Sequence, residues 1–540
     1  FFKVQSISSS AAWGASGNGG DVTVEVDGRM TLAGLSSVAS STGGAGQAGT
    51  VRVRAETLTI DSGIFVTDLP VWPGGISSDN NGGTGNAGNV ILEIDGMLEL
   101  LNGGQISSSN FGSGNAGTVQ IRAGEISIDT NLPWGQTGIQ TDADRPLFAP
   151  DEWQQERGGN AGFIVLEVAG RIAMHNGTLI SSTTWGAGNA GTLLVRAGEL
   201  VLDSGAQIGS NSRLETPGNA GNVMIDVIGR LDLADGASIS GSTYSAGSAS
   251  TVVVQAGTLR LDDASIASTS GEYVTSTAGT ITIEVDDLAN LSNGSRIATD
   301  TVSAGDAGIV TVRAGMLQIQ SQSEISSAAG PTATGQVGTV TIGTNHLTLD
   351  EGGQISISAR QNQAEQTAPD PDATRGIRID TGTLDLDRAA ITAASTGNVP
   401  ASPITIQADD LLLTGQSRIT TEATQASAGP ISIHGGRLRL TDSLITTSAH
   451  GTTGNGGDIV LTPEYFILDG GFIQANTAAQ GARGGDILID TRALIASQGL
   501  LEIGGATRQD FLIDSGRNII QAAAPGGEQG TINVTAPDLD

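Results

Sequence analysis

Short runs of alternating apolar and polar residues, separated by glycine-rich breaks, recur along the whole chain. In the stretch 188–213, three such runs read LLVRA, ELVL and AQIGS. Alternation with a period of two is typical of strands with one buried face, and Gly, Asn, Asp and Ser favour the corners between strands. The pattern predicts three strands and three corners in each repeat.

The repeat has a period of about 29 residues and is marked by a small residue, the anchor, just before the first strand. A unit this short buries its apolar face only by stacking on its neighbours. We therefore predict an all-β fold, a right-handed parallel β-helix (solenoid) of about 17 coils of about 27–30 residues with loop insertions. The anchors are Gly20, Gly49, Gly88, Gly117, Gly162, Gly191, Gly221, Ser250, Gly279, Gly308 and Gly338.

The fifth residue after each anchor points outward and changes the sign of its charge from coil to coil. Parallel strands lie about 4.8 Å apart, so opposite charges on adjacent coils attract and like charges repel. The next position alternates large and small residues in the same way, so the true repeat is a two-coil unit. We predict a structural ladder formed by Glu25, Arg54, Glu93, Arg122, Glu167, Arg196, Asp226, Gln255, Glu284 and Arg313.

Three further series follow the same period. Ile91, Val165, Leu194, Met224 and Val253 form an apolar stripe at a position that otherwise faces water, which predicts docking of a partner or of an insertion. Aromatic residues at another corner, which we interpret as corner packing, are Trp13, Phe111, Trp185, Tyr244 and Tyr273. Asparagines two residues before the anchor, expected to adopt left-handed corners and to bond along the axis, are Asn18, Asn86, Asn115, Asn160, Asn189, Asn219 and Asn455.

A calcium site is the functional alternative for these asparagine corners, because GNGGD at 17–21 and 454–458 loosely resembles calcium-binding nonapeptide repeats. Tandem nine-residue spacing is absent from the sequence, which disfavours that interpretation.

Insertions near 61–84, 131–158 and 359–376 interrupt the coils and define the organisation of the chain. We predict a regular β-helix over 1–358 with the alternating two-coil repeat. The acidic, proline-bearing insertion 359–376 follows, then a second β-helix segment over 377–490 with a shorter period. Divergent C-terminal coils occupy 491–540.

The first two insertions bring together most of the scarce aromatic residues and several acids. Aromatic faces and carboxylates suit pyranose rings, so a sugar-binding patch is one interpretation. A loop held against the coils by its own aromatics is the other. The candidate ligand-binding residues are Trp72, Trp134, Asp142, Asp144 and Trp153.

Composition narrows the classes of partner. The 540 residues carry a formal net charge of −31 with Lys3 as the single lysine, which disfavours nucleic acid and anionic membranes. No run of about 18 apolar residues occurs, so membrane insertion is not expected. The chain has no cysteine, so disulfides and thiolate metal sites are excluded, and it opens in mid-coil. We therefore expect either a piece of a longer exoprotein or head-to-tail self-association of its open ends.

Catalytic chemistry has few candidates in this sequence. The adjacent carboxylate pairs Asp262–Asp263, Asp286–Asp287 and Asp409–Asp410 fall at corners of different coils, and the four histidines stand in unrelated contexts. Nucleophile-elbow and nucleotide-binding motifs are absent. We predict no enzyme, with no catalytic residue, no cofactor and no metal site.

The coil sequence GNAGTVQIRAGEISID at 114–129, with ISSSNFGSGNAG and ISSTTWGAGNAG between coils, resembles the repeat region of filamentous-haemagglutinin-like exoproteins of two-partner secretion. The tail NIIQAAAPGGEQGTINVTAPDLD resembles the closing part of such proteins. This resemblance implies export through an outer-membrane transporter partner and display as a filamentous adhesin on a Gram-negative-type bacterium. The family's N-terminal secretion domain has no counterpart, because no Asn-Pro step occurs in this sequence.

Two functions are therefore expected. The first is an extracellular structural or adhesive exoprotein, a filamentous stalk or fibre for attachment to surfaces or cells, with cell-surface or matrix glycans as partners. The alternative is a carbohydrate-binding or polysaccharide-active β-helix protein that uses the flank of Trp72, Trp134 and Trp153.

Overall fold

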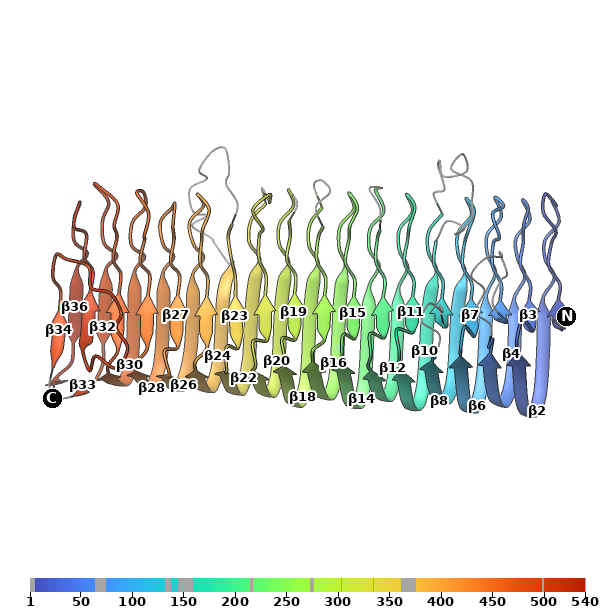
Figure 1. The fold of residues 1–540 in the computed structure, drawn as a ribbon, viewed down its shortest axis with the longest axis horizontal. Coiled ribbons are helices and arrows are strands. Elements are labelled where there is room, and N and C mark those ends of the chain that lie inside the picture. The colour runs from blue at the N-terminus through green and yellow to red at the C-terminus, as the bar shows by residue number, and fades with distance from the viewer. Residues whose placement is uncertain are drawn as a thin grey trace. The chain divides into compact units, whose positions relative to one another are not determined.

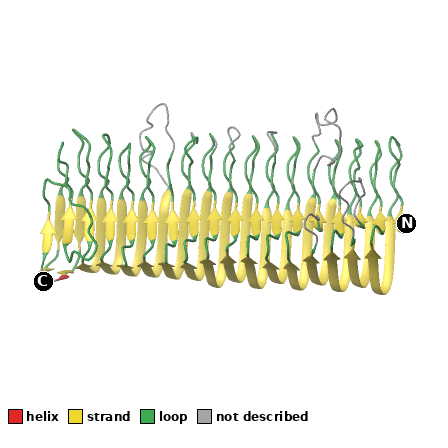
Figure 2. Ribbon diagram, viewed as in Figure 1, coloured by secondary structure: helices red, strands yellow, loops and turns green. Residues whose placement is uncertain are grey.

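The structure of the protein is a computed structural model, and it is an all-β parallel solenoid (Figure 2). It divides into two compact units, Phe1–Thr280 and Ile281–Asp540. The residues described are 5–63, 74–131, 137–143, 159–213, 217–271, 276–302, 304–333, 335–360, 375–497 and 500–539.

Each turn of the first unit contains one long and one short strand, joined by turns and loops (Figure 1). The long strands are β2 (Val22–Ala33), β4 (Val51–Asp61), β6 (Val90–Leu101), β8 (Thr118–Asp129), β10 (Phe163–Met174), β12 (Leu193–Leu202), β14 (Val223–Ala234) and β16 (Thr251–Asp262). The short strands are β1 (Ser6–Ser8), β3 (Ser37–Ala39), β5 (Gly75–Ser77), β7 (Gln105–Ser107), β9 (Gly138–Gln140), β11 (Leu179–Ser181), β13 (Gln207–Gly209), β15 (Ser238–Ser240) and β17 (Ser265–Ala267).

The second unit repeats this arrangement until its last two turns. Its long strands are β18 (Thr280–Ser292, which begins at the boundary), β20 (Ile309–Ile319), β22 (Thr339–Asp350), β24 (Gly376–Asp387), β26 (Ile404–Thr414), β28 (Ile431–Thr441) and β30 (Ile459–Asp469). Its short strands are β19 (Arg296–Ala298), β21 (Glu324–Ser326), β23 (Gln354–Ser356), β25 (Ala390–Thr392), β27 (Arg418–Thr420), β29 (Leu444–Thr446) and β31 (Phe472–Gln474). The final strands are β32 (Ile487–Asp490), β33 (Ala493–Ala496), β34 (Leu501–Ile503), β35 (Asn518–Gln521), β36 (Ile532–Thr535) and β37 (Asp538–Leu539).

The solenoid has about 15 turns, close to the 17 expected. In the last turns the long strand is broken in two, into β32 and β33 and then into β36 and β37. Strands pair in parallel and in register, so that Val51 pairs with Val90 and Ile121 with Leu166. All four side chains are fully buried. Rows of identical or similar aliphatic residues therefore stack along the inside of each unit and form its core.

The sequence predicted three strands per turn, whereas the described turns have two. The runs LLVRA and ELVL are halves of the single strand β12, joined through Gly198. Pairing resumes after a register shift between Ala197 and Leu200, which is a β-bulge rather than the end of a strand. The expected corner is thus a bend within one long strand.

The asparagines before the anchors hold adjacent turns together, but not as left-handed corners. Positive φ angles occur instead at Asn102 (46°) and Asn176 (59°), near the other end of the long strand. The side-chain oxygen of Asn189 accepts a hydrogen bond from the backbone N–H of Asn219 at 3.0 Å and a second one from the Asn219 side-chain amide at 3.0 Å. The expectation of bonding along the axis is therefore confirmed, and that of left-handed geometry is wrong for these residues.

The anchor position requires glycine because consecutive turns approach closely there. A Cβ placed on Gly221 would lie 1.7 Å from the carbonyl oxygen of Gly191 and 2.4 Å from the Ser210 hydroxyl. Ser250 is the exception, and in its turn the serine at the facing position is replaced by Gly241. The Ser250 hydroxyl donates to the carbonyl oxygens of Gly221 (2.5 Å) and Gly241 (3.2 Å) and thereby takes over the role of the missing serine.

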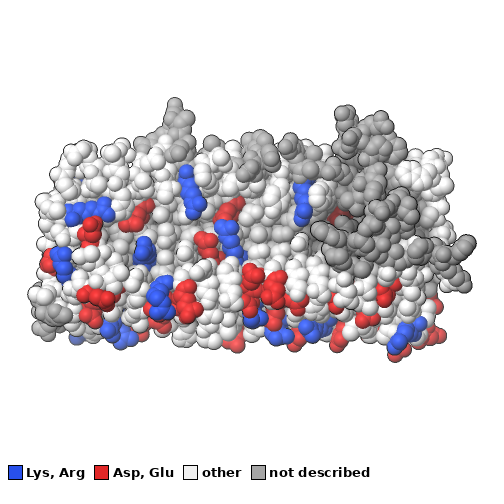
Figure 3. All heavy atoms as spheres, viewed as in Figure 1, with Lys and Arg blue, Asp and Glu red and all other residues white. Residues whose placement is uncertain are grey.

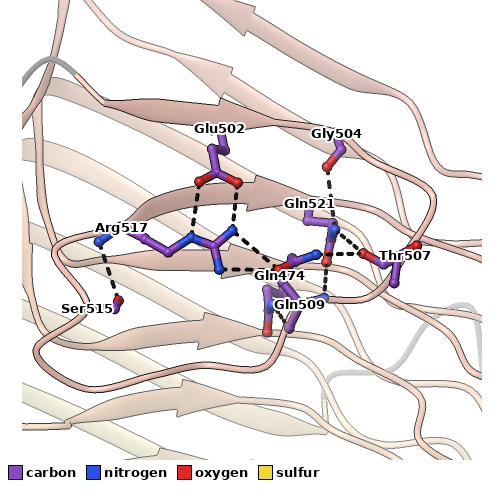
Figure 4. Close-up of polar contacts among 8 residues, drawn as sticks. All are labelled: Gln474, Glu502, Gly504, Thr507, Gln509, Ser515, Arg517 and Gln521. Carbon is purple, nitrogen blue, oxygen red and sulfur yellow. Dashed lines mark hydrogen bonds and ion pairs between the residues drawn. The ribbon is translucent and has the colours of Figure 1, made fainter.

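The last turns depart from simple chain order. Strand β35 lies between β31 and β34 and pairs in parallel with both, although β34 precedes it in the sequence. The loop between β34 and β35 is held by a network shown in Figure 4. Arg517 donates to both carboxylate oxygens of Glu502 at 3.0 and 2.7 Å, while the Gln521 amide donates to the Thr507 carbonyl at 2.9 Å.

Candidate functional site

A mainly apolar row, five apolar residues and one glutamine, occupies the outward face of six consecutive long strands in the first unit; we call it the apolar row. Strand pairing aligns Ile91, Gln120, Val165, Leu194, Met224 and Val253 in direct succession from β6 to β16. Met224 is 37% exposed, and the other members are partly exposed. The corresponding outward residues of most other turns are Thr23, Arg52, Thr311, Thr341, Arg378, Thr405 and Ser432, and near the end of the second unit they are Val460 and Leu488. The apolar row is therefore a local feature rather than a general property of the solenoid surface.

A charged row lies two residues further along the same strands. The pairing puts Glu93, Arg122, Glu167, Arg196, Asp226 and Gln255 in succession, which is the register that the sequence predicted. We call the apolar row and this charged row together the interaction strip. Acidic and basic side chains are similarly interspersed on the face drawn in Figure 3.

Ion pairs connect the central members of the charged row. Arg122 Nε lies 2.6 Å from Glu167 Oε2, and Arg196 lies 3.8 Å from the other oxygen of Glu167. Arg196 Nε is also 3.6 Å from Asp226. The hydrogen bond to Glu167 raises the pKa of Arg122 above its usual value, so this guanidinium stays charged.

The ladder is less continuous outside the strip. Glu25 and Arg54 face each other in register, but neither has an ion-pair partner within 4.0 Å in the part of the chain that the structure describes. In the second unit, Glu284 and Arg313 form an ion pair of 3.8 Å. The ion-paired part of the ladder in the first unit thus coincides with the apolar row.

An open groove of about 750 Å³ runs along the charged row of the first unit. Its lining includes Glu93, Arg122, Glu167, Arg196 and Asp226. The groove forms at the bend of the long strands, where large and small residues alternate from turn to turn. At one end stands Ile228, which is 83% exposed. The strip therefore combines partly exposed apolar area, paired charges and a concave surface.

The predicted sugar-binding residues are not brought together by described contacts. Trp72, Trp134, Asp144 and Trp153 lie outside the described residues. Asp142 is buried, and its Oδ1 accepts hydrogen bonds from the Ser181 hydroxyl at 2.6 Å and the Thr183 backbone N–H at 2.7 Å. Its carboxylate thus links two turns of the solenoid.

Asp142 belongs to an axial file of acceptors that sequence reasoning missed. Each member accepts a hydrogen bond from the backbone N–H of its counterpart in the next turn. The members are Ser10, Ser41, Asp79, Ser109, Asp142, Thr183, Asn211 and Ser242. The signal in the sequence is the small polar residue three positions after the isoleucine or valine of each short strand.

Two members of this file carry buried carboxyl groups. Burial raises the pKa of Asp79 and of Asp142 to about 6, although hydrogen bonds to the carboxylates act in the opposite direction. Asp79 accepts from the Ser109 N–H at 2.7 Å and from the Ser107 hydroxyl at 3.0 Å. These groups are fully engaged in holding the turns in register.

A second groove, of about 500 Å³, lies over the short strands of the first turns. Its lining is rich in hydroxyls, including those of Ser8, Ser41, Ser77 and Ser107, and it also includes Trp13. Trp13 is 66% exposed, so the expected corner packing covers only part of its ring. This groove is a second candidate binding surface.

The histidines have separate structural partners. His175 contacts Asp203 at 2.8 Å, and His450 contacts Glu422 at 2.8 Å. Within the described ranges, no group of three or more His, Cys, Asp or Glu side chains is arranged to hold a metal ion. The described part of the chain also contains no helix of sufficient length and apolarity to cross a bilayer.

Comparison with known proteins gives no relative from which a function could be transferred. No protein-family model matches the chain, and neither a curated protein nor a solved structure is significantly similar to it.

Proposed function

We propose that the chain is an extracellular structural and adhesive protein whose solenoid presents the interaction strip as an attachment surface. The observation that carries this proposal is the localisation of the apolar row. Partly exposed aliphatic residues occupy a position that most turns outside the strip fill with Thr, Ser or Arg, with Val460 and Leu488 as apolar exceptions in the second unit. Contiguous apolar area bordered by charged residues is typical of surfaces that bind other molecules.

The arrangement of charges supports attachment over catalysis. In the groove, Arg122, Glu167, Arg196 and Asp226 pair along the solenoid axis. Their carboxylates are engaged with guanidinium groups instead of standing opposite each other across a cleft, as glycoside hydrolysis requires. A binding surface that extends over several turns suits a large partner.

The resemblance to filamentous-haemagglutinin-like repeats supplies the cellular setting of the proposal. We infer display at the surface of a Gram-negative-type bacterium after export through an outer-membrane transporter partner. Rows of hydrogen bonds between turns, such as those of Asn189 and Asp142, suit an extended protein that has to remain rigid outside the cell.

Beads coated with the chain test the adhesive function. We expect them to be retained under flow on at least one immobilised cell-surface glycan or matrix protein, above beads coated with an inert protein of similar charge. A Leu194→Asp variant should reduce retention, whereas Thr405→Asp, at the same position of a turn in the second unit, should not. Equal retention of wild-type and inert beads on every surface would refute the proposal.

The serine-lined groove beside Trp13 favours a second candidate, carbohydrate binding. An exposed indole face next to several hydroxyls is suited to a sugar ring. A glycan array with wild type, Trp13→Ala and Trp134→Ala would separate this groove from the Trp72/Trp134/Trp153 flank. Binding lost in one variant assigns the site, while turnover of a polysaccharide would support an enzyme.

A further inference from the structure

We propose that the interaction strip binds the strip of a second copy of the same chain, with the two solenoid axes antiparallel. The inference names a partner for the attachment surface proposed above and so rests on that proposal. Two observations carry it. The apolar row spans six turns, and the charged row beside it alternates in sign over the same turns.

Because its charges alternate, the charged row is complementary to the same row of a second copy that runs in the opposite direction. Consider a two-fold axis that lies along the strands, between the turns of Glu167 and Arg196. It brings Glu167 opposite Arg196 of the second copy and Arg122 opposite Asp226 of the second copy. Both contacts join opposite charges, and each occurs twice because the interface is isologous. The outermost contact pairs Glu93 with Gln255, an acid with a neutral amide.

The same axis also matches the apolar row. Val165 meets Leu194 of the second copy at the centre, and Ile91 meets Val253 at the two ends. The six turns of the apolar row are centred on this axis, so no apolar member faces a charged one. Gln120 and Met224 form the remaining contact.

Parallel packing cannot satisfy both rows. In a parallel dimer the two-fold axis runs parallel to the solenoid axis, and rotation about it exchanges the two sides of the apolar row. The charged row would then face the outward residues on the other side, which include Asn89, Thr118 and Asn222. Only rotation about an axis along the strands lets each row face itself. The geometry therefore selects the antiparallel dimer.

Within the strip, the overall charge of the chain opposes association only weakly. The chain carries a net charge of −31, which favours repulsion between copies. From Glu93 to Gln255 the charged row contains three acids, two arginines and one amide, a net charge of −1. Nearly balanced charge next to partly exposed apolar area makes this face suitable for contact between two acidic molecules.

The area of the strip determines how strongly the two copies are expected to bind. Six turns at about 4.8 Å make the strip about 29 Å long, and its two rows with the backbone beside them are about 17 Å wide, which gives about 500 Å² per copy, or about 1,000 Å² in total. This area lies at the lower end of specific interfaces, so a reversible dimer with a Kd of about 1–100 μM is expected. Many copies on one surface would raise the effective affinity.

Sedimentation velocity of the intact chain tests the dimer between about 1 and about 200 μM. The weight-average mass of wild type should rise towards twice that of the 54.3 kDa chain. Met224→Asp should weaken association at least about tenfold. Thr405→Asp, at the equivalent position of the second unit, should leave it unchanged, and circular dichroism should show that both variants are folded.

Charge reversal tests the orientation. Arg122→Glu alone places two acids opposite each other in the dimer, and Asp226→Arg alone places two arginines opposite each other. We expect each variant alone to be monomeric, whereas their mixture should associate. In the mixed dimer the introduced glutamate faces the introduced arginine at one end, and the native Arg122 and Asp226 face each other at the other end. Mixing does not repair a misfolded chain, so recovery on mixing identifies the antiparallel contact.

Three results would overturn the proposal: a folded wild type that stays monomeric at about 200 μM, association insensitive to Met224→Asp, or a mixture no more associated than its components. A monomeric chain whose beads still adhere overturns the dimer and leaves the adhesive function standing. A dimer whose beads adhere to nothing supports the dimer and refutes that function.

Discussion

The two buried aspartates of the axial file allow the contacts between turns to be tested by a one-atom change. Asn211 occupies the same position as Asp79 and Asp142, accepts from the Ser242 N–H at 2.9 Å and donates to the Ser240 hydroxyl at 2.9 Å. Asparagine therefore fits this environment. The double variant Asp79→Asn/Asp142→Asn should keep the fold and be more stable than wild type at neutral pH.

The sign and the size of this change in stability follow from the raised pKa values of the two carboxyl groups. Burial raises the pKa of both groups from 3.8 to about 6, so the folded state binds protons more tightly than the unfolded state. Their contribution to stability is greatest below about pH 4 and is lost as the pH rises through about 6. A difference of about two in pKa corresponds to about 3 kcal/mol, and the substitution also replaces a hydroxyl-to-carboxylate hydrogen bond by the weaker amide-to-hydroxyl bond that Asn211 makes. We expect a gain of about 1–3 kcal/mol per site at pH 7.5.

Urea unfolding at pH 7.5 and pH 4, followed by circular dichroism, measures the gain. Hydrogen exchange of the peptides that contain Ser109 and Thr183 reports whether it is local. Asp300→Asn is the matched control, because Asp300 accepts from the Ala328 N–H at 2.8 Å but also pairs with Arg296. This control should lose stability. A double variant no more stable than wild type at pH 7.5, or equally stabilised at both pH values, would show that burial of charge is not the dominant effect.

Three further comparisons test the stacking of the turns by thermal unfolding. Gly221→Ala should cost about 2 kcal/mol or more, whereas Gly28→Ala, which has open space at its Cβ, should be nearly neutral. Arg122→Glu should lower Tm more at low than at high salt, since it places three acids in succession; equal losses at both salts would contradict the electrostatic account. Deleting one turn, 191–220, should destabilise more than deleting two turns, 162–220, because only the first brings like charges together.

The solenoid was predictable from the sequence because a period of about 29 residues repeats both the apolar and the charged positions. Once Val51 and Val90 are placed on the inside, the stacking of equivalent residues fixes which turn neighbours which. The register of Glu93, Arg122 and Glu167 then follows without any knowledge of the loops. The strip was visible in the sequence as an apolar stripe beside a ladder of alternating charge.

Other features depend on backbone geometry that residue patterns do not encode. Gly198 was interpreted as a corner, but the chain continues through it as a bulge within β12. Asn189 was assigned a left-handed backbone because asparagine tolerates that conformation. Its side-chain oxygen instead accepts a hydrogen bond from the backbone of the next turn. Asp142 was considered as a sugar ligand because its burial cannot be recognised from the local sequence. The residues that bury it and donate to its carboxylate come from a neighbouring turn far away in the sequence.

The β-bulges explain why the repeat unit of the first solenoid segment is two turns. Between paired positions, the turns of Ile94 and Val168 have two unpaired residues at the bend, and the turns of Ala123 and Ala197 have one. Turns with wider and narrower bends therefore alternate, so neighbouring turns need complementary side chains, large against small and acid against base. From β20 onward the long strands β20 to β30 pair without such shifts, and the alternation of charge ends there too. The same alternation that stabilises the stack makes the strip complementary to its own reverse, so the architecture of one chain supplies the condition for pairing of two.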